Sequence, residues 1–379
     1  MTSAKSTWID DLRNNARMQF ETLEYPNFRY GLTIRMDYSD LKTEHLEKLK
    51  DQSNIEFKNT DGINILPLKK ALHSHNNILQ QHLTKLMPEQ HKFAQLHRML
   101  FECMVIHVPK NKTLGKPLII NRNGGIHHLF IIAESPITII ETRESCNSKN
   151  KSRSLQSLVS NATEIIVKNN ATVNFISIQK YDNSTFHFDY KNALTEPNTA
   201  MNWIDFCLGS AFTHSTIAST LQGQGSSSDI KTIFFGDKEQ RFDVGAHIIH
   251  AAPHTHGNIA TKGVLNDKSK NIYRGLIKIK QNAPSSMGYQ KEDVLMLSID
   301  AEADSIPQLE IDNNDVKCSH AATTTHVDDE RLFYLMARGL NKKSATKMFV
   351  QGFLNPFIEQ ITDEKIVEEI KEHIAERLE

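Results

Sequence analysis

Cysteine is scarce in this sequence, with four residues among 379, at positions 103, 146, 207 and 318. None forms a CxxC pair and the spacing is wide, which excludes a dense disulfide framework and a zinc finger built on paired cysteines. The chain also lacks an excess of either charge, because 44 Lys and Arg residues face 45 Asp and Glu residues. Without a basic surplus there is no long-range field to attract nucleic acid, so we expect no nucleic-acid partner.

Long apolar runs are missing as well. No stretch of about 18 uninterrupted apolar residues predicts a membrane span, and the first residues, MTSAKSTWIDDLRNN, lack the apolar core of a signal peptide. We therefore expect a cytoplasmic protein with reduced thiols and no membrane partner. The sequence contains neither a GxxxxGK[ST] phosphate loop nor a GxSxG turn. We expect no ATP hydrolysis by this chain and no catalytic residues.

The residue patterns that are present divide the chain into three regions. Residues 1–100 are polar, with apolar stripes at helical spacing, and predict a mainly helical region. Residues 101–325 form a succession of short β-type runs separated by Asn, Asp and Gly, which suit turns. Residues 326–379 predict three short amphipathic helices, the last with apolar residues at every fourth position from Ile366 to Leu378.

The middle region decides the fold class. More than 200 residues of short strands without interleaved helices exclude a doubly wound fold and leave a sandwich, a propeller or a solenoid. Turns rich in asparagine near positions 266, 282 and 313 recur at rung-like intervals, although no strict sequence period is present. We therefore favour a mainly β solenoid between two helical regions. The clearest predicted strands are 104–109, 117–120, 129–132, 137–140, 163–167, 173–178, 230–235, 272–279, 294–299 and 309–311.

Cys318 and His320 form the most informative pair of side chains. They are two positions apart in a segment that reads as extended, so both point to one face of a strand while Ser319 points to the other. A thiolate and an imidazole can hold a soft or borderline metal or an iron–sulfur species. Two ligands are only half a site, so the pattern suggests that a partner completes it. A buried Cys beside a hydrogen-bonded His is the other interpretation.

The 18 histidines give weaker signals, and we expect most of them, including His91 and His97, to lie at the surface. The segment HIIHAAPHTH places the densest cluster at positions 247, 250, 254 and 256, but its spacing matches no zinc motif. These four histidines either bind a metal or form hydrogen bonds along turns, and the sequence does not decide between the two. No pair of carboxylates suited to glycoside chemistry stands out, which weakens a carbohydrate-enzyme interpretation.

Several phrases resemble the SufB/SufD family of the iron–sulfur cluster assembly machinery, and SufD more than SufB. The resemblance is strongest from about residue 221 to 357. It includes LQGQGSSSD, HAAPHTHG, KGVL at 262–265, YRGLIKI at 273–279, DSIPQLEI at 304–311, DVKCSH at 315–320 and ERLFYLMARGL at 330–340, with weaker phrases in FRYG at 28–31 and VIHVPKN at 105–111.

The resemblance implies a right-handed parallel β-helix that pairs with a SufB-like subunit and binds a SufC-like ATPase, which would hydrolyse the ATP. His320 and Cys318 match residues at the SufB–SufD interface where a cluster forms, so an iron–sulfur cluster would be transient and shared rather than stably bound. Lys291 stands where SufB-like sequences have a scaffold cysteine, and Ala321 stands where they have a glutamate. Both departures favour a SufD-like, non-catalytic scaffold.

The helices after His326 match the region that docks the ATPase in this family. The expected docking residues are Leu332, Phe333, Leu335, Met336, Met348, Phe349 and Phe353. A SufB-like scaffold that nucleates the cluster itself is the alternative role, and a β-helical carbohydrate-active enzyme is a third. Edge strands of a solenoid also allow a homodimer.

Overall fold

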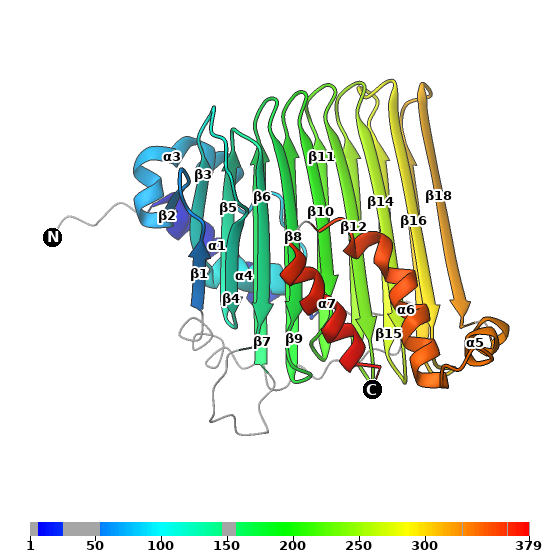
Figure 1. Ribbon diagram of the computed structural model, residues 1–379. Helices are drawn as coiled ribbons and strands as arrows, with labels where there is room; N and C mark the ends of the chain where they lie inside the picture. The colour runs from blue at the N-terminus through cyan, green and yellow to red at the C-terminus, as the bar shows by residue number, and fades with distance from the viewer. Residues whose placement is uncertain (1–6, 26–53, 146–156, 328, 362, 379) are drawn as a thin grey trace.

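The computed structural model describes residues 7–25, 54–145, 157–327, 329–361 and 363–378 (Figure 1). Two nine-stranded sheets face each other, and the chain alternates between them. The strands of sheet A are β1 (Asn54–Lys58), β4 (Leu118–Asn123), β6 (Ile137–Glu144), β8 (Thr172–Lys180), β10 (Ala200–Cys207), β12 (Ser227–Gly236), β14 (His256–Leu265), β16 (Ser286–Met296) and β18 (Val316–His326). The strands of sheet B are β2 (Asn64–Pro67), β3 (Glu102–Val108), β5 (Ile126–Ala133), β7 (Ser157–Val167), β9 (Thr185–Thr195), β11 (Phe212–Leu221), β13 (Arg241–His250), β15 (Lys270–Ile279) and β17 (Glu302–Ile311).

The strand register makes this fold a solenoid of about seven turns. Each strand from β3 onward pairs in parallel with the strand two places later in the chain, so that Ser227 lies beside His256 and His256 beside Met287. Among the described strands, only β1 and β2, at the N-terminal end, pair antiparallel with their neighbours β4 and β3. The predicted mainly β solenoid with flanking helices is confirmed.

Apolar side chains from both sheets fill much of the solenoid interior. Strand alternation sends every second residue inward, and those residues, such as Trp203, Ile230 and Ile259, are at most 1% exposed. The turns use the residues that the sequence indicated. Asn170 and Asp267 adopt positive φ angles of 63° and 50°, a conformation that Asn and Asp tolerate better than most residues.

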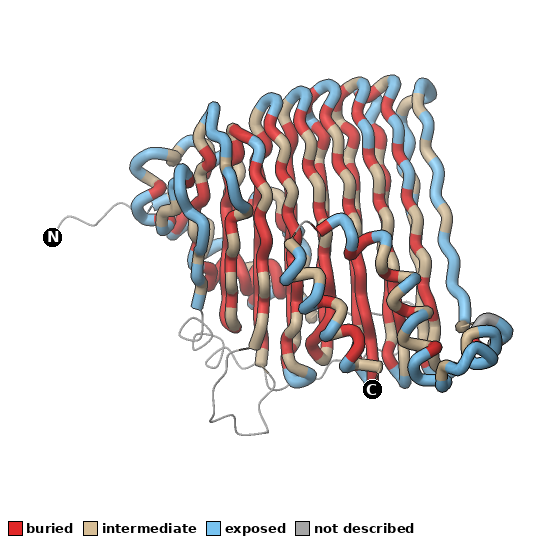
Figure 2. The backbone as a smooth tube through the Cα atoms, viewed as in Figure 1, coloured by how far each residue is buried: buried red, intermediate tan, exposed pale blue. Residues whose placement is uncertain are grey.

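Helices pack on part of the outer face of each sheet (Figures 1 and 2). The N-terminal helices α1 (Trp8–Thr22), α3 (Leu68–His82) and α4 (Lys92–Leu100) share a hydrophobic cluster with strands of sheet B. Helix α5 (Asp329–Met336) lies beside the end of β18, and α6 (Lys342–Ile358) and α7 (Glu364–Glu376) pack on sheet A. Helices α6 and α7 therefore share a hydrophobic cluster with the outer face of sheet A.

Arg377 fixes the end of α7 to the solenoid. Its Nη2 atom donates to Asp237 Oδ1 at 2.6 Å and its Nη1 atom donates to the Phe235 carbonyl at 2.9 Å. The guanidinium also lies 4.9 Å from the centroid of the Phe235 ring. A guanidinium with several donors in a fixed plane can hold a carboxylate and backbone carbonyls together. The helix is thereby tied to β12 and to the turn that follows it.

Some sequence-based expectations differ from the structure. The first 100 residues contain the strands β1 and β2 in addition to helices. The predicted strand 294–299 covers only the last three residues of β16 and runs three residues past its end at Met296. His97 is fully buried and not at the surface, because its ring contacts His128 and Ser160. The FRYG phrase at 28–31 and Cys146 lie outside the described residues.

Candidate functional site

The last strand of sheet A, β18, carries Cys318 and His320. Their register partners on β16 are Gly288 and Gln290, which are buried and face the solenoid interior. Cys318 and His320 therefore share the inward face of β18, and the prediction that they lie on one face is confirmed. Ser319 faces outward. No strand pairs with the far side of β18 within the described residues, so this end of the solenoid, formed by β17 and β18, is open.

The Cys318 thiol is half-buried. Burial raises its pKa above the ordinary value, and a backbone hydrogen bond from Ser319 offsets part of this rise. Its sulfur lies 3.1 Å from the position that a Cβ atom at residue 288 would occupy, so the glycine there makes room for it. A thiol with a raised pKa stays protonated at neutral pH until a cation or a metal stabilises the thiolate.

His320 is exposed beside this thiol. Its register partner Gln290 is only 1% exposed, so exposure changes abruptly from the last covered strand to the open end. The described residues contain no group of three or more His, Cys, Asp or Glu side chains that could hold a metal ion. Cys318 and His320 alone provide one soft and one borderline ligand. Any metal species held here would need further ligands from outside this set.

The open end combines unpaired backbone with apolar side chains. Most residues of β18 are exposed, and β17 is only partly covered. Ile311 on β17 is 40% exposed, and Ile299, in the loop before β17, is 90% exposed. An edge strand with free N–H and C=O groups can accept a strand from another chain. This end of the solenoid is therefore suited to association.

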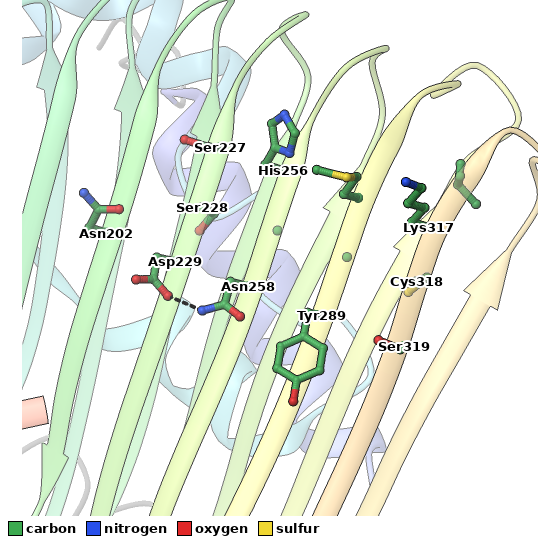
Figure 3. A pocket seen from close by; sticks show the side chains of 14 residues that line it. Asn202, Ser227, Ser228, Asp229, His256, Asn258, Tyr289, Lys317, Cys318 and Ser319 are labelled. Atoms are coloured by element: carbon green, nitrogen blue, oxygen red, sulfur yellow. Dashed lines mark hydrogen bonds between the residues drawn. The ribbon is translucent and has the colours of Figure 1, made fainter. Parts of the chain in front are cut away.

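A shallow groove of about 870 Å³ lies on the outer face of sheet A next to this end (Figure 3). Its side chains come from successive strands at the same register. The Asn258 amide donates to Asp229 Oδ1 at 2.8 Å, and Tyr289 and Ser319 continue the row towards β18. The outer face of β18 thus borders a polar groove, whereas its inner face carries the thiol and the imidazole.

The predicted ATPase-docking residues fall into two groups. Phe333, Met336 and Met348 are exposed, with Phe333 at 71%. Leu332 is buried, Leu335 is half-buried, and Phe349 and Phe353 pack partly against the cluster that α6 and α7 share with sheet A. The Lys262 ammonium lies 4.5 Å from the Phe353 ring centroid. Within the described residues, the first group and Tyr334, which is 57% exposed, are the exposed large apolar side chains of α5 and α6, and the Tyr334 ring lies 4.6 Å from the Arg338 guanidinium.

The four clustered histidines do not converge. His247 lies on the outer face of β13, His254 is exposed in a turn with a positive φ of 56°, and His256 is exposed at the start of β14. His250 points inward, where its Nδ1 atom lies 2.8 Å from Thr255 Oγ1, and burial lowers its pKa to about 4. His250 thus fits the interpretation of a turn hydrogen bond, and the described residues form no metal site here.

The sequence did not indicate a network of six buried charges in the solenoid interior. Three cations and three anions, each at most 1% exposed, alternate across β4, β6, β9 and β10. The guanidinium of Arg143 is central, because it contacts Glu141 at 3.3 Å, Asp205 at 3.4 Å and also Asp189. The complete set is Arg122, Glu141, Arg143, Asp189, Lys191 and Asp205.

The charges in this network stabilise one another. Burial alone would lower the pKa of Arg143, but Asp189, Glu141 and Asp205 hold it well above its ordinary value. Burial alone would raise the pKa of Asp189, but Arg143 and Lys191 hold it well below its ordinary range. Arg143 and Asp189 are therefore charged in the folded protein, and the three basic and three acidic side chains of the network match in number, as a buried network requires.

Glu292 is a further buried acid, outside this network, that the sequence reasoning missed. It lies on the inward face of β16, two residues beyond Gln290, and is 2% exposed. Burial raises its pKa to about 7, and a hydrogen bond with Ser305 offsets part of the rise. Alternation with the buried Val294 could have indicated its inward direction. A carboxyl that titrates near neutral pH thus lies close beneath the open end.

No helix among the described residues is long and apolar enough to cross a membrane.

Residues 119–353 match the family model described as SUF system FeS cluster assembly, SufBD core domain. The chain is 30% identical over 376 residues to an iron-sulfur cluster assembly SufBD family protein of Staphylococcus saprophyticus, covering 97% of this chain and 78% of that protein. It is also 30% identical over 375 residues to a protein with the same description from Staphylococcus aureus strain USA300, covering 96% of this chain and 78% of that protein. The chain therefore belongs to the SufBD family of the SUF system for iron–sulfur cluster assembly.

Proposed function

We propose that this chain is a SufD-like, non-catalytic scaffold subunit of a SUF complex. In this role its open end pairs with the β-helix of a SufB-like subunit, and its C-terminal helices bind a SufC-like ATPase. The observation that carries the proposal is the open end itself, where β17 and β18 have edges that no described strand pairs with, and where Cys318 and His320 face inward. A partner strand beside β18 would cover both side chains and could bring the ligands that the described residues do not supply.

The iron–sulfur cluster is cargo in this proposal. The raised pKa of Cys318 keeps the thiol protonated until a cationic species approaches, so the free subunit is a weak metal ligand. The exposed His320 imidazole is accessible from the partner's side. This arrangement favours transient binding at a shared interface over a stable centre in one subunit, and it favours the SufD-like role over that of a SufB-like scaffold.

The interface proposal is tested by co-expressing the chain with SufB-like and SufC-like partners. His320→Ala should lower the yield of assembled cluster while the complex still co-purifies, because an exposed histidine contributes little to folding. An unchanged cluster yield would remove His320 from the site.

Anaerobic reconstitution of the chain alone addresses the alternative role. A stable chromophore with stoichiometric iron and sulfide would favour a SufB-like scaffold, and a homodimer in the absence of partners would show that the open end pairs with itself.

The docking proposal is best tested with point variants. Deleting residues 328–379 would remove α6 and α7 and expose apolar residues of sheet A, so loss of binding would not be specific. Replacing the exposed Phe333 and Met336 with Ser should weaken ATPase binding without unfolding the chain. Met18→Ser is a matched control, because Met18 is 61% exposed on α1. Retained ATPase binding by the double variant would refute the assignment.

A further inference from the structure

Four buried oxygen-bearing side chains form a closed arrangement inside the last turns of the solenoid. In sheet A, Thr261 on β14 is the register partner of Glu292 on β16. In sheet B, Tyr273 on β15 is the register partner of Ser305 on β17. Across the interior, the Tyr273 hydroxyl faces Thr261 and the Glu292 carboxyl faces Ser305. Neighbouring strands lie about 4.8 Å apart, so the four side chains bound a small volume.

The oxygens in this arrangement approach one another in pairs but without good hydrogen-bond geometry. Thr261 and Tyr273 are each 1% exposed and Glu292 is 2% exposed. Thr261 Oγ1, the Tyr273 hydroxyl, Glu292 Oε1 and Ser305 Oγ form no hydrogen bond of full geometry, although the pairs face each other. Leaving buried polar atoms unpaired costs free energy, and each such group in a native fold needs a physical explanation.

Gln290 contributes a fifth oxygen. Its Nε2 atom donates to the Gln308 carbonyl at 3.4 Å, which turns its Oε1 atom away from that strand. A Cβ atom built on Gly275 would lie 2.4 Å from Gln290 Oε1 and 2.7 Å from the Tyr273 hydroxyl oxygen. These two oxygens therefore lie close together over the glycine, and any larger residue at position 275 would displace them. Gln290 Oε1 is also buried and unpartnered.

Glu292 is the one charged group among these five side chains. Within the described residues no Lys, Arg or His forms a salt bridge with it, and the nearby Asp293 adds an unfavourable negative charge. Burial is the main reason that its pKa rises to about 7. A carboxylate in this position is costly unless a positive charge joins it. In the network of six charged side chains, by contrast, each acid has a basic partner, which Glu292 does not have among the described residues.

We infer that these five oxygens bind a monovalent cation, Na⁺ or K⁺, inside the solenoid beneath its open end. The donor set consists of one carboxylate and four neutral oxygens, so it supplies a single negative charge. Ca²⁺ sites draw on six to eight oxygens that commonly include several carboxylates, and Mg²⁺ retains several waters in octahedral geometry. A single carboxylate among hydroxyl and amide oxygens therefore suits a monovalent ion better than either divalent ion.

The cation would connect four strands. Its ligands come from β14, β15, β16 and β17, and the next position of the same ladder, on β18, is Ala322, which has no oxygen in its side chain. The site is therefore complete one strand before the edge of sheet A. Binding stabilises the turn on which Cys318 and His320 rest, because a ligand that binds only the folded state raises its stability. This inference concerns the chain alone and does not depend on the proposed partners.

The test uses the full chain, dialysed into choline chloride and titrated with KCl or NaCl at constant ionic strength. Isothermal calorimetry should give a saturable heat for one of these salts, and the thermal unfolding midpoint should rise with the same concentration dependence. Glu292→Gln should weaken the affinity by at least about tenfold, because it removes the only charge. Tyr273→Phe should weaken it by a smaller factor. Glu310→Gln, an exposed acid on β17, is the control and should bind like the wild type.

Two results would overturn the inference. The first is the absence of a response to K⁺ or Na⁺ beyond that to choline. The second is an equal response from Glu292→Gln and the wild type, with Tyr273→Phe deciding the matter if the Gln variant does not fold.

Discussion

Arg143→Met should strongly destabilise the fold. The guanidinium is fully buried and contacts Glu141, Asp189 and Asp205, while methionine has a similar length and no charge. After the change, three carboxylates face only two cations, so one buried negative charge is uncompensated. Breaking a buried ion network in this way costs about 3–5 kcal/mol. This is a large part of a total stability that is typically about 5–15 kcal/mol.

Urea unfolding followed by circular dichroism measures this loss as a lower midpoint. The control is Lys278→Met, which removes a cation from an exposed pair with Glu310 and should leave the midpoint within error. A double variant separates charge from packing. Adding Asp189→Asn to Arg143→Met restores the balance of two cations and two anions, so it should recover part of the lost stability. If the double variant is no more stable than the single one, the loss comes from packing and the electrostatic reasoning is wrong.

Three further predictions concern the open end and the C-terminal helix. Gly288→Val should lower the free energy of unfolding by about 1–3 kcal/mol and therefore lower the thermal midpoint. The reason is that a Cβ atom at this position would lie 2.8 Å from Ile277 Cγ2 and 3.1 Å from the Cys318 sulfur. An unchanged midpoint would mean that β18 moves freely. In choline chloride, the free energy of unfolding of the wild type, relative to that of Glu292→Gln, should fall by roughly 3 kcal/mol as the pH rises from about 4.5 to 7. The folded carboxyl keeps its proton up to a pKa of about 7, whereas the unfolded one has already released it. A pH-independent difference in urea midpoints would contradict this. Arg377→Ala should expose α7 to limited proteolysis while the solenoid stays protected, and equal cleavage rates in variant and wild type would show that Arg377 is not the anchor.

Much of the fold could be predicted because its strongest signals are local. Short runs such as 129–132 and 173–178 are rich in β-branched and aromatic residues, and they became β5 and β8. Asn170 and Asp267 occupy turns because Asn and Asp tolerate a positive φ, a property of the residue type that can be read without knowing its neighbours. The shared face of Cys318 and His320 follows from strand alternation alone.

The features that the sequence did not reveal depend on contacts between distant residues. Asp189 and Lys191 point inward from strand β9. In a sequence, charged residues like these predict an exposed segment unless the oppositely charged side chains that pair with them are known. Those partners include Arg143 on β6 and Asp205 on β10, which are separated from β9 by a turn of the solenoid or part of one. Alternation also could not say which face of β18 is the inner one. The register with Gly288 decides that, and the register is set by the preceding turns.

The two ends of the solenoid are unlike, and this difference limits how copies or relatives can associate. At the N-terminal end the sheets finish with the short antiparallel strands β1 and β2, of five and four residues, whereas at the other end the parallel strands β17 and β18, of ten and eleven residues, have edges that no described strand pairs with. If association uses only the long edges of β17 and β18, two joined solenoids cannot elongate, because each has then used its one such end. The expected product is a closed pair of solenoids with a fixed stoichiometry, in which the thiol and imidazole of one rod meet the corresponding face of the other at the midpoint and not along a fibre.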